Sequence, residues 1–164
     1  MMERCYRSAT IQIGENAMTA NRKEATPKTV VLVTNQFQCE RIIHAGQTVA
    51  DITKTELCVF SVQSGRYPQN PLALEHLYKV SKSHDATMNI VYGDDPVKLI
   101  ISFIKHNKTQ NVLTGLPQGE DSILCDVWRK FTHVRFFTVD GEGNTAEVTR
   151  AQIPARRKAK PASI

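Results

Sequence analysis

The chain has 164 residues, of which 41% are hydrophobic and 23% charged, and its formal net charge is +5. This length is enough for one domain with a buried core, and the composition is typical of a globular protein rather than a disordered one. The longest apolar runs, residues 30–33 and 99–101, are too short to cross a bilayer, and no signal-peptide pattern opens the chain. We therefore expect no membrane span and a cytoplasmic protein.

Residues 1–28 form a polar lead in which residues 10–13 are a candidate short strand and Pro27 marks the boundary. After it, short runs rich in β-branched and aromatic residues alternate with apolar positions at helical spacing. The predicted strands cover residues 30–33, 57–62, 87–92, 111–114 and 134–139. The predicted helices cover residues 39–52, 72–83, 96–108 and 122–131.

Two local signals support these boundaries. Asp95 is placed to cap a helix with Pro96 at its first position. Residues 140–144 predict a hairpin turn into residues 146–149, which would add an antiparallel strand at the edge of the sheet. The alternation predicts an α/β fold with three α/β/α layers, in which helices cover both faces of a five-stranded parallel sheet.

The five basic residues from Arg150 onward, with no acid among them, account for the whole net charge. A basic tail can bind nucleic acid or acidic lipid, but this one has no aromatic residue interleaved. A disordered, solubilising end is the favoured interpretation, and we expect no nucleic-acid partner. The predicted organisation is a lead (1–28), an α/β domain (29–149) and a basic disordered tail (150–164).

The four cysteines, Cys5, Cys39, Cys58 and Cys125, have neither zinc-knuckle nor Cys-x-x-Cys spacing. We therefore expect reduced thiols and no metal site. The five histidines are scattered, and no serine or cysteine has a sequence partner that indicates a catalytic triad.

A glycine-bearing loop follows the fourth predicted strand and leads to a helix start near Ser122. Its glycines, Gly115 and Gly119, either expose backbone amides to a phosphate or only allow a tight turn out of the strand. The loop after the first strand, with Thr34, Asn35 and Gln36, should lie opposite, because ligands bind at the carboxyl ends of parallel strands where the strand order reverses. Asn35 and Gln36 either bond a ligand or are ordinary strand-ending residues.

In the order of these pieces, residues 29–139 resemble the universal stress protein family. The resemblance depends on the first strand with its small-residue helix, on residues 93–96 as a Gly-x-Pro-like helix entry, and on residues 109–115 in place of the family's Asp-Leu-Ile-Val-Met-Gly strand. The first loop is similar to that of the stress-protein domain in potassium-sensing histidine kinases. The family implies the strand order 3-2-1-4-5 and a homodimer through the fifth strand, here carrying Phe136, Phe137 and Val139.

One subgroup of the family binds ATP or AMP. In this chain the resemblance implies binding through Thr34, Asn35, Val62, Gly115, Gly119 and Ser122. The chain departs from that subgroup in two places. Thr34 and Asn35 stand where the subgroup has an acid. Its Gly-x2-Gly-x9-Gly pattern is broken, because three residues rather than two separate Gly115 from Gly119 and Arg129 stands at the last glycine position.

Two hypotheses follow. In the first, the chain is a cytoplasmic regulatory protein that binds an adenine nucleotide (ATP, AMP or cyclic di-AMP) without catalysis. In the second, it is a protein–protein interaction module that acts through its sheet edge or basic tail and binds no nucleotide. An enzyme is disfavoured, because no histidine pair or catalytic lysine is apparent near the expected phosphate position.

Overall fold

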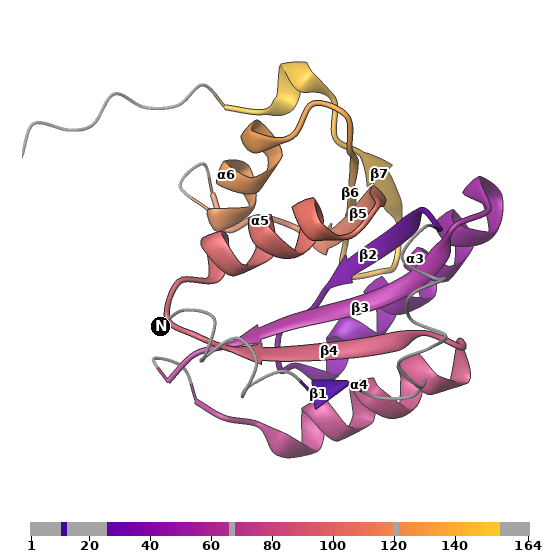
Figure 1. The fold of residues 1–164 in the computed structure, drawn as a ribbon, viewed down its shortest axis with the longest axis vertical. Helices are drawn as coiled ribbons and strands as arrows, with labels where there is room; N and C mark the ends of the chain where they lie inside the picture. Colours follow the sequence, from indigo (N-terminus) through magenta and orange to yellow (C-terminus); the bar gives the residue numbers. More distant parts are fainter. Residues whose placement is uncertain (1–10, 13–25, 66–67, 120–121, 155–164) are drawn as a thin grey trace, which may run out of the picture.

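A computed structural model describes residues 11–12, 26–65, 68–119 and 122–154 (Figure 1). The strands are β1 (Ile11–Gln12), β2 (Lys28–Leu32), β3 (Glu56–Gln63), β4 (Thr87–Tyr92), β5 (Thr109–Gly115), β6 (Arg135–Val139) and β7 (Thr145–Glu147). The helices are η1 (Phe37–Cys39), α3 (Glu40–Thr53), α4 (Pro71–Ser83), α5 (Pro96–His106), α6 (Ile123–Lys130) and η2 (Arg150–Gln152).

The described strands form one sheet in the order β1-β4-β3-β2-β5-β6-β7. Its five central strands are parallel, which confirms the predicted order 3-2-1-4-5. The two outer strands are antiparallel: β7 pairs with β6 as expected, and β1 pairs with β4 at the opposite edge, where the sequence offered only a candidate strand.

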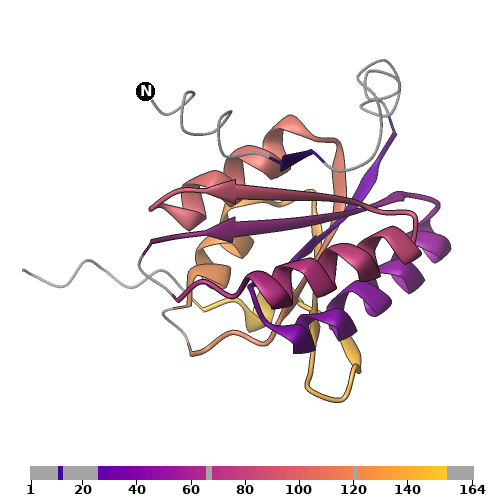
Figure 2. The same ribbon diagram turned by 90° about the horizontal axis from the view of Figure 1, so that it is seen from below.

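Helices cover both faces of the sheet, with α3 and α4 on one face and α5 and α6 on the other (Figures 1 and 2). Successive strand residues point to opposite faces. Val31, Val59 and Leu113 pack with the first helix pair, whereas Val30, Phe60 and Val112 pack with the second. Because both faces are covered, the central strands must be apolar on both sides, which explains their continuous β-branched runs.

Helix α3 lies very close to the sheet because Gly46 faces it. A Cβ at this position would collide with the side chain of Val31 and lie 3.0 Å from Leu57 Cδ1. The small-residue face predicted for this helix therefore lets the helix backbone approach β2. This close packing places the first turn of α3 beside the carboxyl end of β2.

Three helices begin at capping side chains. Asp95 accepts a hydrogen bond from the Lys98 amide at 3.2 Å, and Pro96 occupies the first helical position, as the sequence predicted. Asn70 caps α4 and Ser122 caps α6 in the same manner.

The fifth parallel strand is not a sheet edge, which corrects the expected route to a dimer. β7 occupies the outer side of β6, and Arg135 of β6 forms two hydrogen bonds to the Glu147 carboxylate, at 2.8 and 3.0 Å. Phe136 and Phe137 are buried within the chain itself. Backbone pairing of β6 with a second copy would require β7 to leave.

The ordered domain extends beyond the predicted boundary at residue 149. Val148 and Ile153 pack against the core between the sheet and α5–α6, and Arg129 Nε donates to the Pro154 carbonyl at 2.9 Å. The first five residues of the predicted disordered tail are thus held by apolar burial and a hydrogen bond. The rest of that tail (155–164) and most of the lead (1–10 and 13–25) lie outside the described residues. Within the described ranges, no helix has the length and apolar character needed to cross a membrane.

Candidate functional site

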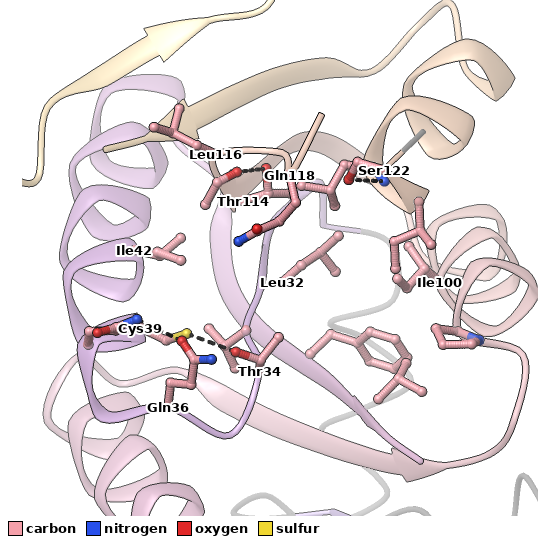
Figure 3. A pocket seen from close by; sticks show the side chains of 18 of the residues that line it. Leu32, Thr34, Gln36, Cys39, Ile42, Ile100, Thr114, Leu116, Gln118 and Ser122 are labelled. Carbon is pink, nitrogen blue, oxygen red and sulfur yellow. Dashed lines mark hydrogen bonds between the residues drawn. The ribbon is translucent and has the colours of Figure 1, made fainter. Parts of the chain in front are cut away.

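A cavity of about 330 Å³ lies at the carboxyl ends of β2, β3 and β5 (Figure 3). We call it the carboxyl-end cavity. Its described lining residues are Leu32, Val33, Thr34, Gln36, Gln38, Cys39, Arg41, Ile42, Phe60, Val62, Pro96, Ile100, Thr114, Gly115, Leu116, Gln118, Ser122, Ile123 and Leu124. The strand order reverses between β2 and β5, so the cavity occupies the topological switch point where parallel α/β sheets bind ligands.

The cavity has apolar walls and a polar mouth. The walls are the buried side chains of Leu32, Phe60 and Ile100, whereas the mouth carries the exposed side chains of Gln36 and Gln118. Small-molecule sites commonly combine an apolar lining with a few polar groups and occupy about 300–1,000 Å³. This cavity is therefore at the small end of that range.

Four of the six residues predicted from sequence line the cavity: Thr34, Val62, Gly115 and Ser122. Thr34 and Ser122 lie on opposite sides of it (Figure 3). Thr34 Oγ1 lies 3.4 Å from Cys39 Sγ, and Ser122 Oγ accepts the Leu124 amide hydrogen. Each hydroxyl is thus oriented by its own loop or helix start.

The other two predicted residues lie elsewhere. Asn35 is not among the lining residues, and its Nδ2 donates to the Pro68 carbonyl at 2.8 Å, where it ties the first loop to the segment before α4. Gly119 also lies outside the lining, has a φ of +102° and has no atom within 4 Å of the position a Cβ would take. The turn alone explains this glycine, because L-residues rarely adopt that φ.

Gly115 has a different role from Gly119. A Cβ here would lie 3.6 Å from Arg41 Nη2 and 3.6 Å from Ile42 Cδ1, which is ordinary contact, and its φ is not in the left-handed region. The backbone does not require glycine at this position. Its absent side chain instead leaves space between the end of β5 and the first turn of α3.

Sequence reasoning missed Arg41, which is the one charged residue among the described lining residues. Arg41 Nε donates to the Asp140 carbonyl at 2.6 Å, and Nη1 donates to the Gln38 carbonyl at 2.6 Å. The only sequence signal was its place in the first turn of the helix that follows the first strand, since that turn lies at the carboxyl end of the sheet.

The Asp140 carboxylate forms its hydrogen bonds within the β6–β7 turn. It accepts hydrogen bonds from the backbone amides of Asn144 and Glu142, both at 2.9 Å. These bonds, the one from Asn144 foremost, lower the pKa of Asp140. Among the described lining residues, Arg41 carries the one positive charge and there is no carboxylate.

Among the described residues, no group of three or more histidine, cysteine, aspartate or glutamate side chains could hold a metal ion. Cys39, Cys58 and Cys125 are buried. Burial raises the pKa of Cys58 to about 12, so that thiol is protonated and unreactive in the folded chain.

No protein-family model and no curated protein matches the chain. Solved structures do match. A universal stress protein solved in complex with cAMP aligns with a TM-score of 0.55 at 14% identity, over 71% of this chain and 98% of that chain. A universal stress protein from Archaeoglobus fulgidus aligns with a TM-score of 0.49 at 16% identity, over 66% of this chain and 90% of that chain.

A third structure, the universal stress protein from Archaeoglobus fulgidus in complex with dAMP, aligns with a TM-score of 0.49 at 15% identity, over 66% of this chain and 94% of that chain. At these identities the likeness concerns the fold. The parallel order, the flanking helices and the first of these alignments agree with the sequence resemblance. The chain contains a universal stress protein-like α/β domain.

Proposed function

We propose that this protein is a regulatory protein that binds an adenine nucleotide in the carboxyl-end cavity and does not turn it over. The observation that carries the proposal is the cavity itself, which lies at the topological switch point and has apolar walls below a polar mouth. A purine base suits the walls, and a ribose and phosphate suit the mouth. The cAMP complex of a protein with this fold supports the same class of ligand.

The size of the cavity favours a mononucleotide. A volume of about 330 Å³ is at the lower limit for small-molecule sites, so AMP or cAMP suits it better than ATP or cyclic di-AMP. The proposal of binding without turnover is supported by the chemistry of the lining. Its described polar side chains are hydroxyls, amides, one thiol and one guanidinium, with no carboxylate or imidazole to act as a base beside a bound phosphate.

Thermal unfolding with and without millimolar AMP, cAMP, ATP and cyclic di-AMP tests this proposal. A ligand that binds only the folded state raises the midpoint, by an amount that grows with the ratio of its concentration to Kd. We expect the largest rise from a mononucleotide. If none of the four moves the midpoint of folded protein, nucleotide binding is excluded.

Gly115→Val is the informative variant. Its φ accepts an L-residue and the first added carbon makes ordinary contacts, so the fold should tolerate the change while the larger side chain fills space beside Arg41. We expect the nucleotide-induced rise to disappear. Gly65→Val is the matched control, because Gly65 has no atom within 4 Å of its Cβ position and lies outside the cavity lining. An unchanged response in Gly115→Val would place any ligand elsewhere.

A further inference from the structure

The Arg41 guanidinium is held in a fixed position by two carbonyl groups. Its bond to the Asp140 carbonyl joins the first turn of α3 to the β6–β7 turn, and its bond to the Gln38 carbonyl joins it to η1. These bonds use two of the five N–H groups of the side chain. The remaining three, on Nη1 and Nη2, make no hydrogen bond to a described residue.

No described carboxylate forms an ion pair with this guanidinium. None of the ion pairs among the described residues includes Arg41, and no carboxylate is among the described residues that line the cavity. Arg41 is only partly exposed. A partly buried cation that two carbonyl groups hold in place, and that keeps unused donors at a ligand cavity, can bind an incoming anion through charge-assisted hydrogen bonds.

The position of Nη2 shows where that anion would lie. Nη2 is 3.6 Å from the point a Cβ on Gly115 would occupy, so the guanidinium faces the space that the glycine leaves empty at the end of β5. Gly119, the other loop glycine expected to approach a phosphate, lies outside the cavity lining. The described residues of the glycine loop that line the cavity carry no charge, whereas Arg41 supplies both charge and directed N–H groups.

We propose that Arg41 binds the phosphate of the ligand between its guanidinium and Gly115, and that it makes the cavity select nucleotides over nucleosides. This inference rests on the proposed function, since it concerns the same cavity. The Asp140 carbonyl positions the guanidinium, and the side chain of Asp140 in turn holds the β6–β7 turn that presents this carbonyl. The hairpin that covers β6 is thus also a support for the phosphate site.

The test compares AMP with adenosine by isothermal titration calorimetry on the wild type, Arg41→Gln and Arg129→Gln. In the wild type, AMP should bind at least about tenfold more tightly than adenosine, as expected for charge-assisted hydrogen bonds. Arg41→Gln should lose this preference and keep its affinity for adenosine. Arg129→Gln is the matched control, because Arg129 also donates Nε to a backbone carbonyl, that of Pro154, but lies outside the cavity lining.

The outcomes separate the two proposals. Equal binding of AMP and adenosine by the wild type, or an AMP preference that survives in Arg41→Gln, would overturn the role of Arg41 and leave nucleoside binding intact. Binding of neither ligand would overturn the proposed function together with this inference. If Arg41→Gln does not fold, competition in the wild type decides: inorganic phosphate should weaken AMP binding and leave adenosine binding unchanged, and an absence of competition would contradict the proposal.

Discussion

Polar side chains lie at both ends of the neighbouring strands β2 and β5, but their roles differ between the two ends. At the amino ends, Asn111 Nδ2 donates to Thr29 Oγ1 at 2.9 Å and to Thr53 Oγ1 at 3.0 Å, and Thr29 Oγ1 lies 2.6 Å from Thr55 Oγ1. These four residues form what we call the amino-end cluster. At the carboxyl ends, Thr34, Gly115 and Arg41 border a cavity.

The comparison separates polar groups that serve the fold from polar groups that are available to a ligand. In the amino-end cluster the Asn111 amide nitrogen and the threonine hydroxyls bond one another, and Asn111 and Thr29 are fully buried. In the carboxyl-end cavity, Arg41 retains N–H groups that no described residue uses. Because Arg41 is only partly exposed and borders a cavity, these N–H groups are available to solvent or to a ligand there.

The largest effect on stability should come from the amino-end cluster. Asn111→Ala removes both hydrogen bonds to the threonines and leaves a buried hole, which should lower the free energy of unfolding by about 1–3 kcal/mol. The Asn111 Oδ1 atom has no partner in the described structure, so its loss offsets part of that cost. Urea unfolding measures the change, and nucleotide binding measured at a temperature where the variant is folded should match the wild type.

Two results would contradict the distinction between the ends. One is a change in stability below about 0.5 kcal/mol, which is typical of surface substitutions. The other is a loss of nucleotide binding in folded Asn111→Ala. Asn89→Ala is a useful control, because Asn89 is partly buried on β4 and makes one long bond, 3.4 Å from its Nδ2 to Cys58 Sγ.

A smaller effect on stability, joined to an effect on binding, is expected at the carboxyl end. Ser122→Ala removes the cap of α6 and should cost about 1 kcal/mol. Because Ser122 also lines the cavity, nucleotide affinity should fall as well. Asn70→Ala is the matched control, since Asn70 caps α4 by accepting the Ala73 amide hydrogen at 3.2 Å but lies outside the cavity lining.

Urea unfolding and calorimetry distinguish these two caps. Asn70→Ala should lose a similar amount of stability and bind nucleotide as the wild type does. Equal binding losses in both variants would mean that Ser122 acts only through the general stability of the domain.

The smallest expected effect is a dependence of stability on pH. It arises at neither end of strands β2 and β5. The amino-end cluster has no titratable group. On the outer side of α3 and α4, however, His84 Nε2 lies 2.8 Å from His44 Nδ1, and His44 Nε2 lies 3.1 Å from the Glu40 carboxylate. Burial, followed by the charge of His44, lowers the pKa of His84 from 6.5.

The folded state therefore binds fewer protons at His84 than the unfolded state as the pH falls below 6.5, so stability decreases there. The pKa of Glu40 is lowered from 4.5, first by its hydrogen bond to His76 and then by the one to His44, so its contribution is lost only in more acidic solution. In the wild type, the urea midpoint should be lower at pH 6 than at pH 7.5, which lie about half a unit below and about one unit above the ordinary histidine pKa. In His84→Gln the midpoints at these two pH values should converge. His133 is exposed, so His133→Gln should keep the difference between the two midpoints. An unchanged difference in His84→Gln would disprove the assignment of the pH dependence to His84.

Much of the fold could be predicted from the sequence because its signals are local. The β-branched runs are required by a sheet covered on both faces, and the Asp95–Pro96 pair marks a helix start wherever that helix packs. The departure from the family's glycine pattern could also be recognised from the sequence. It indicated a departure from the family's usual phosphate loop, but it did not show that Gly119, which was expected to bind the nucleotide, lies in a turn outside the cavity lining.

The remaining features depend on which distant segments meet after the crossovers. The turn of Asn35 toward Pro68 and the packing of Ile153 on the core each join residues that no short window contains. Arg41 is the clearest case, because in sequence it is an ordinary polar residue in the first turn of an amphipathic helix. Only the tertiary structure brings it beside Gly115 and the Asp140 carbonyl, 99 residues away from Arg41, at the edge of a cavity whose described lining residues include no carboxylate.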